Sequence, residues 1–127
     1  MMVGIVIVSH SEKLAQSVAE LAKMMAGEAP IAAAGGLEDG TFGTSYQKIS
    51  AAIESVYSED GVVILMDMGS AVMTTEMVIE DMPGRKIEMV DCPLVEGAVV
   101  AAIGSSTDQS MDQIIKAAMD VATEKKL

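Results

Sequence analysis

Short, wholly apolar runs alternate along this sequence with longer stretches in which apolar residues recur at helical spacing, and this alternation restricts the fold more than any other feature. The clearest runs, Val3–Val8 and Val62–Met66, are rich in β-branched residues, which is typical of strands buried on both faces. Weaker runs occupy Ile31–Ala34 and Ile87–Val90, and Glu88 interrupts the second of these. The sequence therefore predicts four short strands, each separated from the next by a helix.

The stretch after the first run predicts an amphipathic helix. Its apolar residues follow one another at spacings of four, three, one and three positions, as on one helix face; they are Leu14, Val18, Leu21, Ala22 and Met25. Ser9 and Glu12 fit the S-x-x-E capping box, which places the expected helix start at His10. Gly27 is the expected end of this helix.

Four further helices are expected. The second follows the caps Thr44 and Ser45, and the third follows Met68-Gly69-Ser70 and runs to about Asp81. The fourth runs from Leu94 to about Ile103, after Pro93, since proline is favoured in the first turn of a helix. The last runs from Met111 to about Thr123. Gly104 to Asp108 are expected to break the chain between the last two. Strands separated by helices favour right-handed crossovers and a parallel sheet. We therefore expect a single domain over residues 1–127, of the α/β class, with an open doubly wound, mainly parallel four-stranded sheet and helices on both faces.

Composition narrows the function of such a domain. The chain has 127 residues, and 19 acidic residues against 8 basic ones give a net charge of −11. A surface of this charge repels phosphate backbones and anionic lipids, so we expect no nucleic acid and no membrane as partners. The single cysteine, Cys92, cannot form an internal disulfide, and the first apolar run lacks a basic leader. These features predict a cytoplasmic protein.

His10 is the first candidate for chemistry. Open parallel sheets bind ligands beyond the carboxyl ends of their strands, where the strand order reverses, and His10, the only histidine, follows the first strand. Neutral imidazole is a nucleophile, and the free N–H groups of a helix start bind anions. These features suit a histidine that accepts a phosphoryl group; the alternative is a surface histidine without a role in chemistry.

Asp67 is the second candidate, because it ends the third strand. If strands one and three are neighbours, its carboxylate can accept a hydrogen bond from Nδ1–H of His10, which fixes the tautomer and leaves Nε2 free to attack. The alternative is that Asp67 only caps the loop or the helix that follows.

Two glycine-containing segments could contact a phosphate near His10. Gly69 and Ser70 offer backbone N–H groups and a hydroxyl, with Ser70 as a simple helix cap being the alternative. The loop Gly35–Ser45 is long for a strand–helix connection, and such loops are often functional. It could cover the site with Gly43, Thr44 and Ser45, or it could be a flexible surface loop.

The sequence predicts neither a metal nor a cofactor. A metal site needs more than one histidine with scattered carboxylates, and the chain has neither a G-x-G-x-x-G motif after a strand nor a Walker A lysine motif. Cys92, beside Pro93, is interpreted as a half-buried packing residue, although a helix start at this point could lower the pKa of its thiol.

Four motifs in order resemble a known family. They are MVGIVIVSHSEKLA at the N-terminus, the GG-x3-G-x2-GTS loop at Gly35–Ser45, DMGSA at Asp67–Ala71 and PLVEGA at Pro93–Ala98. Together they are similar to the phosphotransferase subunits M of dihydroxyacetone kinases, and more broadly to the mannose-type IIA domains of the phosphoenolpyruvate-dependent phosphotransferase system (PTS). The resemblance covers nearly the whole chain, but Thr74 stands where such proteins are expected to have asparagine.

The resemblance implies a cytoplasmic homodimer that acts as a phosphotransferase subunit. It implies that His10 is phosphorylated on Nε2 by the histidine phosphocarrier protein, with Asp67 as the orienting partner. It further implies that the phosphoryl group passes to ADP on the kinase nucleotide subunit L, and that Gly69, Ser70 and the Gly43–Ser45 segment lie near the phosphate. The Gly69-Ser70-Ala71 turn favours the dihydroxyacetone branch over sugar transport.

Three other functions remain open at the level of sequence. One is a IIA component of a mannose-family sugar transporter, and another is a non-catalytic regulatory module in which His10 is idle. A receiver-type signalling domain would place its phosphorylated aspartate at Asp67. However, such a domain also needs acidic residues after the first strand, where Ser9 and His10 stand, and a lysine after a fifth strand that the sequence does not predict.

Overall fold

A computed structural model describes residues 2–127 and contains one four-stranded parallel sheet. The strands are β1 (Gly4–Ser9), β2 (Ile31–Gly35), β3 (Val62–Met66) and β4 (Ile87–Met89), and their order across the sheet is β2-β1-β3-β4. All three neighbouring pairs are parallel. The predicted open doubly wound α/β fold is confirmed, and the strand order reverses between β1 and β3.

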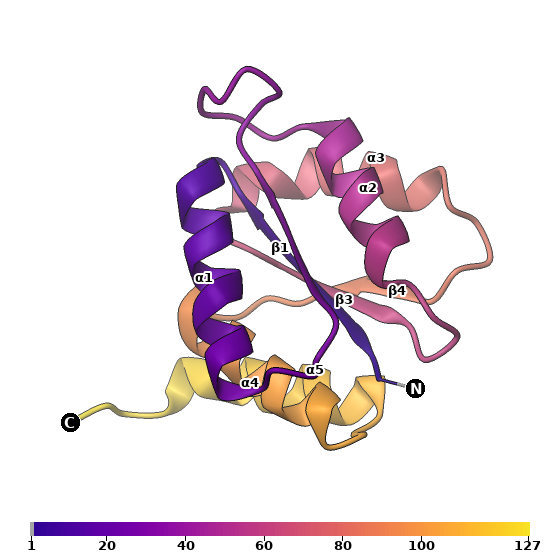
Figure 1. The fold of residues 1–127 in the computed structure, drawn as a ribbon. Helices are drawn as coiled ribbons and strands as arrows, with labels where there is room; N and C mark the ends of the chain where they lie inside the picture. The colour runs from indigo at the N-terminus through magenta and orange to yellow at the C-terminus, as the bar shows by residue number, and fades with distance from the viewer. Residues whose placement is uncertain (1) are drawn as a thin grey trace.

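Five α-helices connect and follow the strands. They are α1 (Glu12–Met25), α2 (Tyr46–Val56), α3 (Val72–Glu80), α4 (Leu94–Ser106) and α5 (Met111–Asp120), with one-turn 3-10 helices η1 (Gly69–Ala71) and η2 (Val121–Thr123). Figure 1 shows their arrangement around the sheet. Within residues 2–127, none of the helices has the length and apolar character needed to span a membrane.

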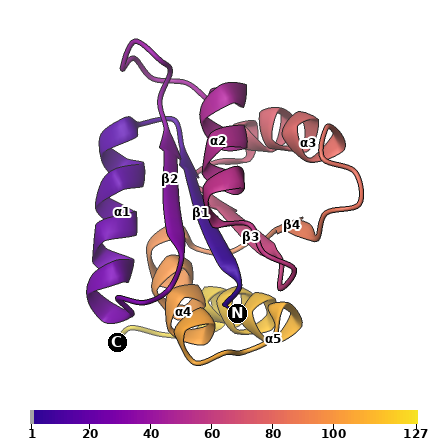
Figure 2. The same ribbon diagram turned by 45° about the vertical axis from the view of Figure 1, so that its right-hand side comes forward.

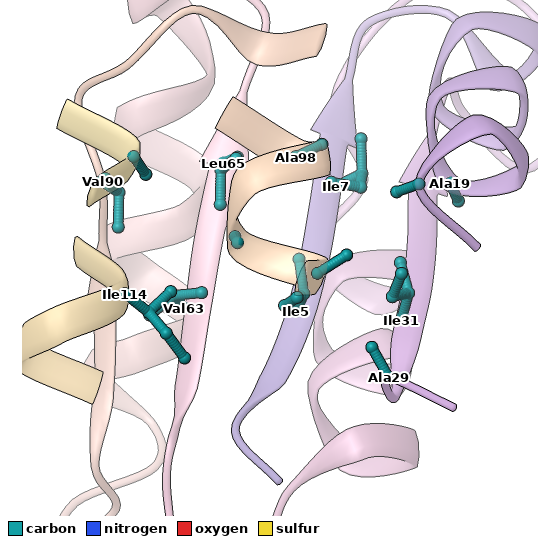
Figure 3. Close-up of a cluster of buried hydrophobic side chains, with 14 of the residues drawn as sticks. Ile5, Ile7, Ala19, Ala29, Ile31, Val63, Leu65, Val90, Ala98 and Ile114 are labelled. Atoms are coloured by element: carbon teal, nitrogen blue, oxygen red, sulfur yellow. The ribbon is translucent and has the colours of Figure 1, made fainter. Parts of the chain in front are cut away.

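The side chains of β1 alternate between two apolar cores, one on each face of the sheet. Ile5 and Ile7 point into a core formed with α1, α4 and α5 (Figure 3). Val6 and Val8 point into a second core, formed with α2 and α3. All four residues are fully buried, as expected for a strand covered on both faces. In Figure 2, α1 and α2 lie on opposite sides of the sheet.

The start of α1 differs from the predicted one. Ser11, rather than Ser9, is the N-cap, and its side chain accepts a hydrogen bond from the backbone N–H of Leu14. Ser9 cannot cap a helix because it is still the last residue of β1, paired with Gly35. The helix therefore begins at Glu12, two residues beyond His10. It ends at Met25 with Ala26 as its C-cap, so Gly27 stands directly after the helix, as predicted.

The buried face of α1 agrees with the predicted stripe at Val18 and Ala22 but differs from it elsewhere. Leu14 and Leu21 are each 40% exposed and Met25 is 56% exposed, whereas the residues that face the core are Ala15, Val18, Ala19 and Ala22. The helix lies so close to β2 that a Cβ on Gly35 would come within 2.7 Å of the Ala15 Cβ. Small side chains allow this close approach, and the larger ones are left on the outside.

Helix α4 continues through Ser106, past the break expected at Gly104. A Cβ on Gly104 would lie 3.0 Å from the Cγ1 of Ile114 and 2.8 Å from the Oε1 of Gln109. Glycine is needed at this position because α5 packs against α4 there, so it is a contact residue rather than a helix breaker. Tertiary packing outweighs the low helix propensity of glycine at this point.

Candidate functional site

The loop after β1 and the loop after β3 meet at the point where the strand order reverses. Val8 of β1 pairs with Met66 of β3, and the backbone N–H of Asp67 donates to the carbonyl of Val8 at 3.1 Å. The residues that follow the two strands, His10 and Asp67, therefore lie side by side at the carboxyl edge of the sheet. This is the position at which open parallel sheets bind ligands.

The His10 ring and the Asp67 carboxylate are hydrogen-bonded. Nδ1 of His10 lies 3.0 Å from Oδ1 of Asp67, and the two side chains are 22% and 12% exposed. A carboxylate can only accept, so the neutral ring carries its proton on Nδ1, and its lone pair is on Nε2. The ring is thus held with its nucleophilic nitrogen directed away from the carboxylate.

The second carboxylate oxygen of Asp67 is held by two more donors. Oδ2 accepts the Ser9 hydroxyl at 2.9 Å and the backbone N–H of His10 at 3.0 Å. Partial burial raises the pKa of Asp67, but the hydrogen bonds from the His10 backbone, Ser9 and the His10 ring together lower it below the ordinary value. Asp67 is therefore a carboxylate at neutral pH.

Ser70 contacts the other ring nitrogen. Its Oγ lies 2.9 Å from Nε2 of His10, and because Nε2 is the acceptor in this tautomer, the Ser70 hydroxyl donates. The alternative of Ser70 as a simple helix cap is wrong, since Ser70 lies inside η1, and neither η1 nor α3 has a side-chain cap. A Cβ on the neighbouring Gly69 would meet nothing within 4 Å, so this side of the turn is open.

The loop between β2 and α2 lies against the site, although its three candidate residues have different contacts. The backbone N–H of Gly43 donates to the carbonyl of His10 at 2.9 Å. The Thr44 hydroxyl lies 3.0 Å from that of Thr74 on α3. The Ser45 hydroxyl caps α2 and donates to Glu38. The structure thus brings Gly43 next to His10, whereas the side chain of Ser45 is engaged in the helix cap.

A cavity of about 340 Å³ lies beside Asp67, between the carboxyl ends of β3 and β4. Its walls include Met66, Met89 and Cys92. Burial, with a smaller contribution from Asp91, raises the pKa of the Cys92 thiol to about 11. The suggestion that a helix start lowers this pKa is therefore wrong, and the thiol is protonated at neutral pH.

No group of three or more histidine, cysteine or acidic side chains within residues 2–127 is arranged to hold a metal ion. The chemistry that the arrangement offers is thus that of an oriented imidazole, with a carboxylate on one nitrogen and a hydroxyl on the other. Sequence reasoning assigned Ser9 only to a helix cap and missed its contact with Asp67. The sequence feature that could have indicated this contact is that Ser9 is the single polar residue at the end of an otherwise apolar strand, directly before the histidine.

Known proteins similar to this chain include both curated relatives and solved structures. A family model described as the PTS system fructose IIA component matches residues 4–115. The PEP-dependent dihydroxyacetone kinase phosphoryl donor subunit DhaM of Escherichia coli (strain K12) is 37% identical over 132 residues, which cover 98% of this chain and 28% of the relative. This chain therefore spans little more than a quarter of that relative's length.

A second relative has a similar length. The PEP-dependent dihydroxyacetone kinase 1 phosphoryl donor subunit DhaM of Listeria innocua serovar 6a is 38% identical over 111 residues, which cover 87% of this chain and 88% of the relative. A crystal structure of a protein of unknown function matches with a TM-score of 0.86 and 30% identity, covering 100% of this chain and 99% of that one. These matches confirm the resemblance that the sequence motifs indicated.

Proposed function

The chain belongs to the family of the PTS system fructose IIA component, and on that premise we propose that it is the phosphohistidine carrier of a phosphoenolpyruvate-dependent dihydroxyacetone kinase. Two relatives that cover most of this chain are named phosphoryl donor subunits of such kinases. The observation that carries the proposal is the 3.0 Å contact between Nδ1 of His10 and Asp67, since it leaves the lone pair of Nε2 for a phosphoryl group.

In the first step, His10 takes the phosphoryl group from the phosphohistidine of the histidine phosphocarrier protein. The lone pair of Nε2 attacks phosphorus, the donor's P–N bond breaks, and its electron pair returns to the donor nitrogen. The His10 ring gains positive character in this step, and the Asp67 carboxylate at Nδ1–H stabilises it. No proton has to move, and so positioning and charge stabilisation suffice.

In the second step, a terminal phosphate oxygen of ADP, held on the kinase nucleotide subunit L, attacks the same phosphorus. The P–Nε2 bond breaks and its electrons return to the ring, which regenerates neutral His10 and forms ATP. Ser70 leaves Nε2 when the phosphoryl group arrives, and its hydroxyl is then placed to donate to a phosphoryl oxygen. Gly69, whose Cβ side is open, leaves room for that group. Gly43 and Thr44 border the site through the hydrogen bond of Gly43 to the His10 backbone and the contact of Thr44 with Thr74, and Ser45 supports them through the helix cap.

The intact mass of the protein after incubation with phosphoenolpyruvate, enzyme I and the histidine phosphocarrier protein tests the first step. We expect one acid-labile phosphoryl group on the wild type and none on His10→Ala, because His10 is the only histidine. Labelling of His10→Ala would overturn the assignment and direct attention to Asp67. Absence of label on both proteins would favour the regulatory binding module.

The acceptor is tested by adding subunit L with ADP to the phosphorylated protein. Loss of the phosphoryl group with formation of ATP supports the kinase function. Retention of the label with subunit L, but loss to a sugar-transporter IIB protein, would assign the chain to the sugar-transport branch. The implied homodimer is tested separately by light scattering at micromolar concentration, where a monomer mass would contradict it.

A further inference from the structure

Ser9 lies behind Asp67, on the side away from the ring, and none of the roles above assigns it to phosphoryl transfer. Resting on the proposed function, we propose that Ser9 is a positioning residue, which holds the Asp67 carboxylate and through it selects the tautomer of His10. The inference rests on a chain of hydrogen bonds from Ser9 through Asp67 to Nδ1 of His10.

The Ser9 hydroxyl is fixed from two sides. It donates to Oδ2 of Asp67 at 2.9 Å and accepts the backbone N–H of Ser11 at 3.0 Å. Ser9 is 0% exposed, and its backbone is fixed by the pairing of β1 with β2. The direction of the hydroxyl is set by the strand and the helix start.

The Ser9 hydrogen bond determines where the other carboxylate oxygen points. A carboxylate rotates about its Cβ–Cγ bond, and the position of Oδ2 sets the position of Oδ1 opposite the ring. With Ser9 present, Oδ2 has two donors, the Ser9 hydroxyl and the backbone N–H of His10. Without it, one donor remains and the plane of the carboxylate is less restricted, so that the preference for a proton on Nδ1 weakens.

A second buried serine provides a matched control. Ser105 is also 0% exposed, and its hydroxyl donates at 2.6 Å to the carbonyl of Val3, just before the other end of β1. Ser105→Ala therefore removes a buried hydrogen bond at the same strand without touching Asp67 or His10. An effect of general destabilisation appears in both alanine variants, whereas an effect of positioning appears only in Ser9→Ala.

The test is a nitrogen-15 NMR spectrum of the imidazole ring in the unphosphorylated full chain, since the shifts of Nδ1 and Nε2 report the tautomer. We expect the Nδ1–H form to dominate in wild type and Ser105→Ala, and the Nε2–H form to gain population in Ser9→Ala. The rate of phosphoryl acceptance by Ser9→Ala should fall by about threefold to tenfold, the range expected from the loss of one hydrogen bond. Ser9→Thr, which keeps the hydroxyl, should restore both values toward wild type.

A wild-type tautomer population in folded Ser9→Ala would overturn the proposal, and so would an equal change in Ser105→Ala. If Ser9→Ala does not fold, Ser9→Cys, which has a similar size but only a weak donor, takes its place. If Ser9→Thr does not fold, the comparison of Ser9→Ala with Ser105→Ala still decides. The NMR measurement requires no phosphoryl donor. A changed tautomer together with no phosphorylation of the wild type would therefore reject the proposed function while leaving the role of Ser9 intact.

Discussion

The first strand of the sheet has a buried serine hydroxyl near each end, and the two hydroxyls have different partners. At the amino end, Ser105 donates to a backbone carbonyl, that of Val3. At the carboxyl end, Ser9 donates to the side chain of Asp67, which also holds an imidazole ring. The same chemical group binds the backbone at one end of the strand and holds the partner of an imidazole ring at the other.

The packing and solvent exposure around the two ends of this strand also differ. At the amino end the chain is packed tightly: a Cβ on Gly4 would clash with the carbonyl oxygen of Val56, and one on Gly61 would lie 2.6 Å from the sulfur of Met111. At the carboxyl end His10 remains 22% exposed. The amino end is thus a closed end, where changes should affect stability. At the carboxyl end the backbone is also tightly packed around Gly35, but the His10 ring reaches solvent, and around this partly open end changes should affect chemistry. The predictions below test this division.

The largest expected effect concerns Asp67→Ala at the open end. Loss of the carboxylate removes the partner of Nδ1, and phosphoryl acceptance by His10 should slow by about tenfold to a hundredfold, as for other residues that orient an imidazole. Rapid-quench measurement of phosphohistidine formation gives the rate, and thermal unfolding checks that the fold is retained. An unchanged rate would remove Asp67 from the mechanism.

Gly4→Ala at the closed end should lower the stability of the fold without changing the rate of phosphoryl transfer. The added methyl group meets the backbone of Val56, which cannot move as a side chain can, so we expect a loss of about 1–3 kcal/mol in the free energy of unfolding, as in other overpacked sites. Urea titration measures this loss. The rate of phosphoryl transfer per folded molecule should stay at the wild-type value, and a slower rate would show that the two ends are coupled.

Low pH should remove the stability that the Asp67 carboxylate contributes at the open end. The pKa of Asp67 is lowered in the folded chain from its ordinary value of 3.8, so the stability that this carboxylate contributes is present above that pH and is lost as the pH falls through the lower native pKa. Unfolding measured between about pH 6 and pH 3 for wild type and Asp67→Asn checks this. The stability difference between them should shrink as the pH falls below 3.8; a difference that stays unchanged below this pH would contradict the prediction.

The smallest effect on phosphoryl acceptance is expected at Cys92. Burial and Asp91 raise the pKa of its thiol to about 11, so iodoacetamide at neutral pH should modify it at least about a hundredfold more slowly than a free cysteine. Mass spectrometry follows the modification, and Cys92→Ser should leave phosphoryl acceptance unchanged. Rapid alkylation would show that the open end extends to the loop after β4.

The sequence predicted those strands and helices that a local residue pattern is enough to indicate. The apolar, β-branched run Val62–Met66 indicated a buried strand, and its bounds agree with those of β3. The order of strands and helices then placed His10 and Asp67 at one edge, because parallel strands share the direction of their carboxyl ends. The fold and the two central site residues could thus be located from pattern alone.

Features decided by tertiary contacts were not predictable in this way. The capping box at Ser9 was wrong because pairing with Gly35 keeps that residue in β1. The inner face of α1 was correct at Val18 and Ala22 but wrong at Leu14, because the helix packs so closely on β2 that Ala15 fits better there. In both cases the local pattern correctly indicated a helix, while packing against β2 determined where the helix starts and which of its side chains are buried.

The hydrogen bonds to Asp67 have one more consequence. Two of its three donors, the Ser9 hydroxyl and the backbone N–H of His10, neither titrate nor react in the proposed cycle. The carboxylate is therefore held in the same place whether the ring is neutral, bears a phosphoryl group or has just released it. Each turnover of the proposed cycle then needs little reorganisation of the polar groups around the ring.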